Sequence, residues 1–443
     1  MEYEVHKVTL VIERQLIHTN FYFCNMLKQR FQAVQLPDFF LLFTACLLVF
    51  MEMIPMILSL FLLVILISLA LQKSKLEFSN WKLSLLAALP FALTVLGLLN
   101  TYNLKDGLAD LSRLLPYFIF PFIFLNFSLE KIKSLKKWTL FAVILGTLFK
   151  LDFYILQALV RFISTGNPRH FFYVNLVQET NSLSFFVLIS LVFVLLNFRE
   201  KSMSKLKIIG FCFIAVNFIF GLILMQSRLI ILASLLITGI FLLLNLKNSA
   251  RWYFASSITM TLFLLFFPAL NGRFKTLAPT QQKSELPDST SSKSELSEST
   301  SNKIDTISCM SSSDLRMNAL KSSLAIVQKN PIFGVGTGDW KDELVKKYIE
   351  LKFYCNANEQ TAPHNQYLRT TLKHGFLGLL VLVAGIFLLF YKAWQTKNYE
   401  KLSYALSLII CLVGYDFIDS GASAPFVAFL STFFYFDQSE RIL

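Results

Sequence analysis

The stretch APHNQYLRTTLKHGFLG, residues 362–378, lies where the longest polar segment of the chain meets an apolar run. His364 and Asn365 are followed by nine residues, then by Gly375, two further residues and Gly378. An apolar run suited to lipid, residues 377–390, comes directly after. The stretch therefore predicts an imidazole at the junction of a polar loop and a membrane span, where water-soluble and lipid-linked substrates can meet.

The composition indicates a membrane protein. Of the 443 residues, 55% are hydrophobic and 16% are charged, and the mean hydropathy is +0.57. Windows of about 20 mostly apolar residues, the length that crosses a bilayer, recur throughout the chain. The net charge of +13 does not indicate a nucleic-acid partner, because Lys and Arg cluster in alternate short loops, as the positive-inside rule expects.

These windows predict an all-α polytopic membrane protein with about twelve transmembrane helices. Residues 1–36 are expected to be a cytoplasmic segment, residues 37–270 to hold nine spans, and residues 374–443 to hold three. The predicted spans are 37–52, 54–72, 83–99, 110–127, 138–163, 175–198, 206–226, 228–246, 252–270, 375–394, 402–416 and 420–436. Nine spans after a cytoplasmic N-terminus place the large loop 271–373 outside, and the last three return the C-terminus to the cytoplasm.

The large extracytoplasmic loop has two predicted parts. Residues 280–313 are rich in Ser, Thr, Lys and Glu, which predicts a flexible spacer that the chemistry does not need. Residues 314–373 are expected to be ordered and helical, because apolar residues recur at helical spacing after Asp314, a residue suited to cap a helix. This ordered part is expected to lie against the membrane face.

His364 is the first candidate site residue. Pro363 and Asn365 indicate the start of a helix, and the partial positive charge of a helix N-terminus disfavours imidazolium. The same end attracts anions such as a diphosphate. His364 is therefore expected to be neutral near pH 7 and able to accept a proton. A loop histidine hydrogen-bonded for structure is the alternative.

Three arginines are candidate binding residues. Arg228 stands at the outer end of the span 228–246, where a charge so close to hydrocarbon usually faces a polar cavity or a partner. Arg316 lies on the predicted loop helix, and two arginines above a membrane can clamp diphosphate oxygens with their planar guanidinium groups. Arg113, near the outer end of the span 110–127, would add to a basic vestibule. A snorkelling Arg228 and a solvated Arg316 are the structural alternatives.

Three further patterns carry weaker predictions. The glycines in GVGTG, residues 334–338, do not have Walker A spacing, so they predict a turn with positive φ rather than a phosphate-binding loop. Lys150 and Asp152 lie within a span, as functional groups or as a structural ion pair. Cys309 and Cys355, the two cysteines of the outer loop, are expected to form a disulfide or to remain free thiols.

The sequence resembles the O-antigen ligase family, within a larger group that includes Wzy-type polymerases and bacterial O-oligosaccharyltransferases. The resemblance is clearest over about 205–390. It is carried by SRLIILASLL at 227–236, by the run from Leu315 to GVGTGDW, and by HNQYLRTTLKHGFLG at 364–378. It implies glycan transfer from an undecaprenyl diphosphate carrier, without metal or nucleotide cofactor, at the outer face of the bacterial inner membrane.

The resemblance also implies roles for individual residues. His364 matches the family's essential loop histidine, and Asn365 of the same motif is assigned to the substrate. Arg228 and Arg316 match donor-binding arginines, which would stabilise the charge on the departing diphosphate. The histidine would either take the acceptor's hydroxyl proton or position the acceptor. Attack opposite the leaving group would invert the anomeric centre.

Four functions stay open from the sequence. A ligase would use a sugar of lipid A–core as acceptor, a polymerase the growing lipid-linked glycan, and an O-oligosaccharyltransferase a protein. A transporter of lipid-linked glycans belongs to a different class, and many spans with intramembrane charges are typical of it. The sequence shows no internal repeat, and a transporter leaves the large outer loop and its histidine unexplained.

Overall fold

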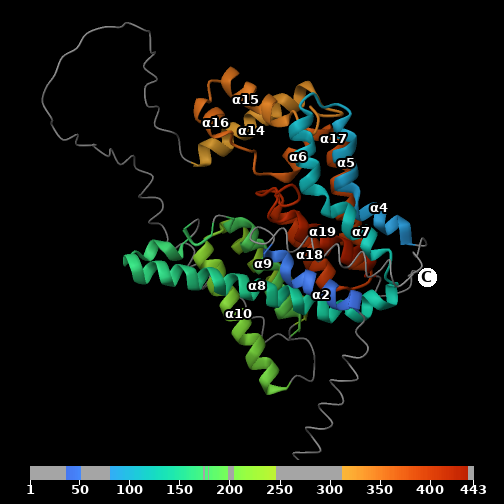
Figure 1. Cartoon of the computed structure of the whole chain (residues 1–443), viewed down its shortest axis with the longest axis vertical. Coiled ribbons are helices and arrows are strands. Elements are labelled where there is room, and N and C mark those ends of the chain that lie inside the picture. Colours follow the sequence, from blue (N-terminus) through green and yellow to red (C-terminus); the bar gives the residue numbers. More distant parts are fainter. Residues whose placement is uncertain are drawn as a thin grey trace, which may run out of the picture.

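All regular secondary structure in the described residues is helical (Figure 1). The computed structural model describes residues 36–50, 80–172, 175–177, 179–197, 204–245 and 312–437. The helices are α2 Leu36–Leu47, η1 Leu48–Phe50, α4 Trp81–Ala87, α5 Leu89–Leu98, α6 Leu104–Leu114, α7 Pro116–Phe124, α8 Leu129–Thr165, η3 Pro168–Phe171, α9 Thr180–Asn197, α10 Lys205–Met225, α11 Arg228–Asn245, α14 Ser312–Lys329, α15 Trp340–Glu350, α16 Tyr354–Glu359, α17 Gln366–Gln395, α18 Tyr399–Cys411 and α19 Ala424–Phe436.

Five segments of this described part are long and apolar enough to cross a membrane. They are Leu104–Phe124, which combines α6 and α7, and the helices α8, α9, α10 and α17. The bent pair α4 and α5 makes a sixth if it is counted as one span. The predicted spans 54–72 and 252–270 lie outside the described residues, so the total of twelve stays a prediction.

The predicted span at 83–99 is sharply bent. The structure has two helices there, α4 and α5, which meet at an angle of 62°. Pro90 stands in the first turn of α5. A proline ring clashes with the preceding turn and lacks the N–H that would continue the helix, so it favours a new helix start at this point.

Aromatic side chains from distant helices pack around α19. All 13 residues of α19 are buried. Phe120 and Phe124 of α7 contact Phe429 edge-on, with ring centroids 5.3 and 5.7 Å apart, and Phe186 of α9 lies 4.4 Å from Phe426. A helix that is apolar on all sides is buried on all sides, and α19 is therefore a central helix of the core.

The helices α14, α15 and α16 form a separate body at one end of the molecule, beside α5, α6 and α17 (Figure 1). It has its own small core, which includes Ala319, Ile326, Trp340 and Tyr348 and reaches Leu372 of α17. Helix α14 begins at Ser312, so Asp314 lies in its first turn and does not precede the helix as predicted. We call α14–α16 with their connections the loop domain.

The glycine-rich segment fastens the loop domain to α5 and α17. Gly334 and Gly336 have φ of 69° and 100°, which confirms the predicted turn. The N–H of Val335 donates to Leu372 O (2.9 Å), that of Gly336 to Lys373 O (3.0 Å), and that of Thr337 to Gly97 O (3.2 Å). These N–H groups are occupied by backbone carbonyls, so the segment has a structural role.

Gly375 is the residue at which α17 changes direction, and replacing it should be costly. Its φ of 65° and ψ of −164° are not helical, and an added Cβ would lie 2.1 Å from Ile332 O. We expect Gly375→Ala to lower stability by at least about 1–3 kcal/mol, the cost of a backbone region open almost only to glycine. Thermal unfolding of the purified protein measures this loss.

Gly210→Ala is the matched control for this substitution. Gly210 lies inside α10, and no heavy atom comes within 4 Å of an added Cβ. Alanine loses less backbone entropy than glycine in a helix, so this variant should be as stable as the parent chain or more so. Equal unfolding temperatures for Gly375→Ala and Gly210→Ala would contradict the structural role of Gly375.

Candidate functional site

His364 stands directly before the first turn of α17. The side-chain carbonyl of Asn365 accepts a hydrogen bond from Leu368 N (3.0 Å) and caps the helix, which begins at Gln366. This confirms the helix start that Pro363 and Asn365 predict. His364 itself has a φ of 43°, in the left-handed region. Residues other than glycine rarely adopt that conformation, so the surrounding contacts must hold it there.

The connection between α18 and α19, residues 412–423, anchors the start of α17. The Gln366 N–H points to Leu412 O (3.0 Å) and Tyr415 O (3.2 Å). The Gln366 side-chain carbonyl accepts a hydrogen bond from Ile418 N (3.2 Å). Two contacts of the Gln366 backbone N–H and one of its buried side chain fix the helix start directly after His364.

The same connection also reaches the start of α11, where Arg228 lies. Ser227, the residue before Arg228, shares a hydrogen bond of 2.8 Å with the Tyr415 hydroxyl. Gly414 packs closely on Leu229, since a Cβ on Gly414 would lie 2.5 Å from a Leu229 methyl. Two helix N-termini, of α11 and α17, are therefore joined through one connection, and the exposed side chain of Arg228 starts from this junction.

Arg316 acts on His364 from the loop domain. Burial by surrounding protein atoms is the main reason that the pKa of His364 is lowered, and the positive charges of Arg316 and Arg369 lower it further. The carboxylate of Asp416 opposes this shift. The predicted neutral imidazole is thus supported, with burial and the two nearby arginines as the causes of the lowered pKa.

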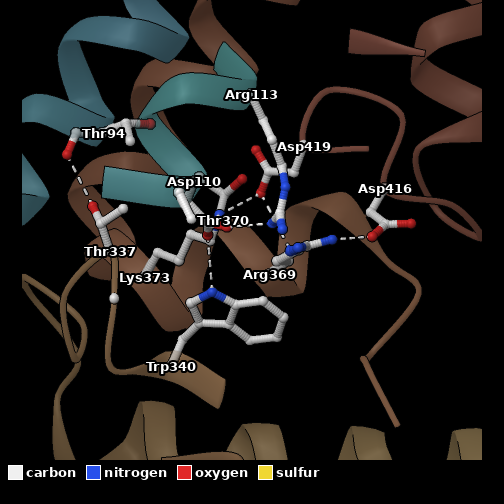
Figure 2. A network of polar contacts seen from close by, with 12 residues as sticks. Thr94, Asp110, Arg113, Thr337, Trp340, Arg369, Thr370, Lys373, Asp416 and Asp419 are labelled. Atoms are coloured by element: carbon white, nitrogen blue, oxygen red, sulfur yellow. Dashed lines mark hydrogen bonds and ion pairs between the residues drawn. The ribbon is translucent and has the colours of Figure 1, made fainter. Parts of the chain in front are cut away.

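A network of charged side chains that sequence reasoning did not single out lies next to this junction (Figure 2). Lys373 Nζ lies 2.9 Å from Asp110 Oδ2 and 2.8 Å from Asp419 Oδ2. Arg369, one turn earlier on α17, forms ion pairs with Asp416 and Asp419. All of these side chains except that of Asp416 are buried. The network links α6, α17 and the connection 412–423.

Trp340 joins the loop domain to this network. Its indole N–H donates to Asp110 Oδ2 (3.1 Å). The Arg369 guanidinium lies 4.5 Å from the centroid of the same ring, a distance at which cation and ring attract each other. One side chain of α15 therefore contacts both a carboxylate of α6 and a cation of α17.

Arg113 is part of this network rather than an unpaired cation of the predicted vestibule. Its Nη1 lies 2.6 Å from Asp110 Oδ1, in an ion pair one helical turn apart. Figure 2 shows its side chain reaching the group formed by Asp110 and Asp419. A substrate-binding role for Arg113 thus has less support from the geometry than roles for Arg228 and Arg316 have.

Asp419 is ionised in this setting. Burial alone would raise the pKa of its carboxyl group, but the charges of Lys373 and Arg369 outweigh burial and hold the pKa at about 2. Asp419 lies between α18 and α19 and accepts a hydrogen bond from Lys373. Asp419 therefore keeps its negative charge over the whole physiological pH range.

The remaining predicted residues lie elsewhere or outside the described part. Lys150 is buried with its Nζ 5.4 Å from the Phe186 ring centroid, whereas Asp152 is exposed and accepts a hydrogen bond from Asn217 (2.8 Å). Cys355 is disulfide-bonded, and Cys309 lies outside the described residues. Most of the predicted spacer also lies outside them. The described residues hold no group of three or more His, Cys, Asp or Glu suited to a metal ion.

Comparison with known families covers the part of the chain that holds Arg228, Arg316 and His364. No curated protein matches the chain. Residues 212–383 match the family whose description is O-antigen ligase. The match runs from α10 into α17, and so includes Arg228, Arg316 and His364. It also agrees with the stretch, about 205–390, over which the motifs carry the resemblance. This segment of the chain is therefore similar to the O-antigen ligase family.

Proposed function

We propose that the protein is a glycosyltransferase of the O-antigen ligase type. It would move a glycan from an undecaprenyl diphosphate carrier to an acceptor hydroxyl, on a lipid A–core sugar, at the outer face of the bacterial inner membrane. The observation that carries this proposal is the junction at residues 412–423. It joins the helix starts of Arg228 and His364 within the family domain.

The chemistry follows from the residues at that junction. A neutral His364 takes the proton of the acceptor hydroxyl, whose oxygen attacks the anomeric carbon of the donor sugar. The bond from that carbon to the diphosphate breaks, and the bonding electrons leave with the diphosphate. Arg228 and Arg316 stabilise its charge, and attack from the opposite face inverts the anomeric centre. If His364 only positions the acceptor, water takes the proton.

Asn365 has two roles in this scheme. Its side-chain carbonyl caps α17 and so fixes the backbone that carries His364. Its amide nitrogen is the group that we assign to substrate binding. The proposed reaction requires no metal ion or cofactor, because the leaving diphosphate is already an activated group and the arginines supply positive charge.

The proposed orientation places the loop domain and His364 outside and both termini in the cytoplasm. In this orientation, residues 37–270 and 374–443 hold the membrane spans, and residues 271–373 lie outside. The starts of α8 and α18 and the end of α19 meet at one place, because Lys136 pairs with Glu400 (3.3 Å) and Asp437 (3.1 Å). All three are predicted cytoplasmic ends. The disulfide-bonded Cys355 of the loop domain suits an oxidising outer compartment.

Transfer by the purified full-length protein in lipid vesicles tests this function. With an undecaprenyl diphosphate-linked glycan and lipid A–core added, we expect glycosylated lipid A–core, detected by mass spectrometry. A longer lipid-linked glycan would identify a polymerase instead, and a glycosylated protein acceptor an O-oligosaccharyltransferase. Movement of the donor across the vesicle membrane without a new glycosidic bond would identify a transporter and would refute transfer.

A further inference from the structure

Two segments far apart in the sequence form an exposed apolar rim beside α17. The rim consists of Ile332 and Phe333 from the loop domain and Phe376 and Leu377 from α17. Their exposed fractions are 61%, 65%, 56% and 49%. The N–H of Phe376 donates to Pro331 O (2.7 Å), and that of Leu377 to Ile332 O (3.4 Å). These bonds hold the two segments side by side.

The rim is fixed in place on both sides. The Gly334 N–H donates to Asn330 O (3.2 Å), which closes the turn that presents Ile332 and Phe333. On the other side, the backbone of Gly375 approaches Ile332 so closely that no Cβ would fit. The turn that carries these exposed apolar side chains is therefore held in place by hydrogen bonding and close packing of its backbone.

The position of the rim along α17 matches the edge of a bilayer. From Phe376 to the end of the helix at Gln395 there are about 20 residues, the number that crosses a hydrocarbon core. The charged residues Arg369 and Lys373 precede this part and are buried inside the protein. Phe376 is thus the first residue of the stretch that lipid can surround, and the rim lies at that depth.

The rim also continues an exposed stripe of the membrane helix. Leu380, Val383 and Phe387 are exposed by 67%, 46% and 58%, and with Phe376 they follow the spacing of one helix face. Lys329, at the end of α14 and just before the turn, is exposed and suits the headgroup region. A surface continuous with a lipid-facing stripe and flanked by a cation fits a bilayer interface.

We propose that Ile332 and Phe333 insert into the lipid leaflet next to α17 and anchor the loop domain on the membrane surface. Removing these side chains from water is favourable, because the free energy scales with the apolar area buried. The anchor would hold α14, and with it Arg316, at a fixed height above the membrane. This inference depends on α17 crossing the membrane and not on the proposed glycan transfer.

Fluorescence quenching by brominated lipid tests the anchor. The full-length Phe333→Trp variant is placed in phosphatidylcholine vesicles with or without brominated acyl chains, and the signal of the native chain, which has five Trp, is subtracted. We expect the added fluorescence to be blue-shifted and to be lost in brominated vesicles. Tyr102→Trp is the control, because Tyr102 is 97% exposed on the polar turn between α5 and α6, and its added fluorescence should persist.

Two results would overturn the anchor. Quenching of Phe333→Trp by aqueous acrylamide but not by brominated lipid would show that the rim faces water. Quenching by neither would show that protein, such as a second copy of this chain, covers the rim. Because tryptophan keeps the aromatic character of the position, the variant is expected to fold, and its far-UV circular dichroism checks this.

Discussion

His364→Ala is expected to abolish glycan transfer while the protein still inserts into the membrane and accumulates. General base catalysis contributes about 10²–10⁴-fold to a rate, so losing the imidazole should reduce transfer by this order. His364 belongs to neither of the two hydrophobic cores of the protein, so its removal should not affect folding. Transfer per protein molecule in vesicles, with the amount of inserted protein measured alongside, gives the result.

His170→Ala is the matched control for this variant. His170 lies in η3, between α8 and α9, and its Nε2 is 3.0 Å from Thr165 Oγ1. It is outside the family domain, so transfer by this variant should equal that of the native chain. Near-normal transfer by His364→Ala would show that His364 takes no part in the reaction.

The pH profile of transfer separates a base from a positioning residue. The pKa of His364 is lowered from its usual 6.5, so a basic imidazole is present at pH 7 and is lost as pH falls through the lowered pKa. Arg316→Gln removes one cause of the lowering, so this acid limb should move to higher pH. Asp416→Asn removes the opposing carboxylate, so the limb should move to lower pH. If the acid limb of the pH profile stays at the same pH in both variants, a group other than His364 causes it.

Local signals in the sequence were sufficient to predict the start of α17 and the glycine turn. Pro363 and Asn365 act on their own neighbours, and Gly334 and Gly336 adopt φ values that other residues rarely reach. The break between α4 and α5 also has a local signal, Pro90, which a count of apolar residues in a window does not register. Local backbone chemistry is therefore the most predictable part of the site.

The charge network could not be predicted in the same way. Arg369 and Lys373 both lie in the decisive stretch, four residues apart on one helix face. Their partners are Asp110, on α6, and Asp419, between α18 and α19. Which carboxylate meets which cation depends on how three distant segments pack. The lowered pKa of His364 also depends on tertiary packing, because its causes are burial and the charges of Arg316 and Arg369.

Lys373→Met is expected to destabilise the protein by about 3–5 kcal/mol, the cost of leaving a buried charge without its partner. The Lys373 ammonium lies between the buried carboxylates of Asp110 and Asp419. Methionine has a similar length but no charge, so the two carboxylates would repel each other across an apolar side chain. Arg113 and Arg369 would still pair with one carboxylate each, so the loss is partial rather than complete. Denaturant unfolding in detergent measures the change.

Lys346→Met is the matched control, with the same substitution on the surface of the loop domain. Lys346 pairs with Glu343 at 2.7 Å, but its side chain is 71% exposed, and water screens and replaces such a pair. Its unfolding should be indistinguishable from that of the native chain. In Lys373→Met/Asp419→Asn one of the two carboxylates that repel each other is gone, so this double variant should regain part of the lost stability. Equal unfolding curves for Lys373→Met and Lys346→Met would show that the network does not hold α6, α17 and the connection 412–423 together.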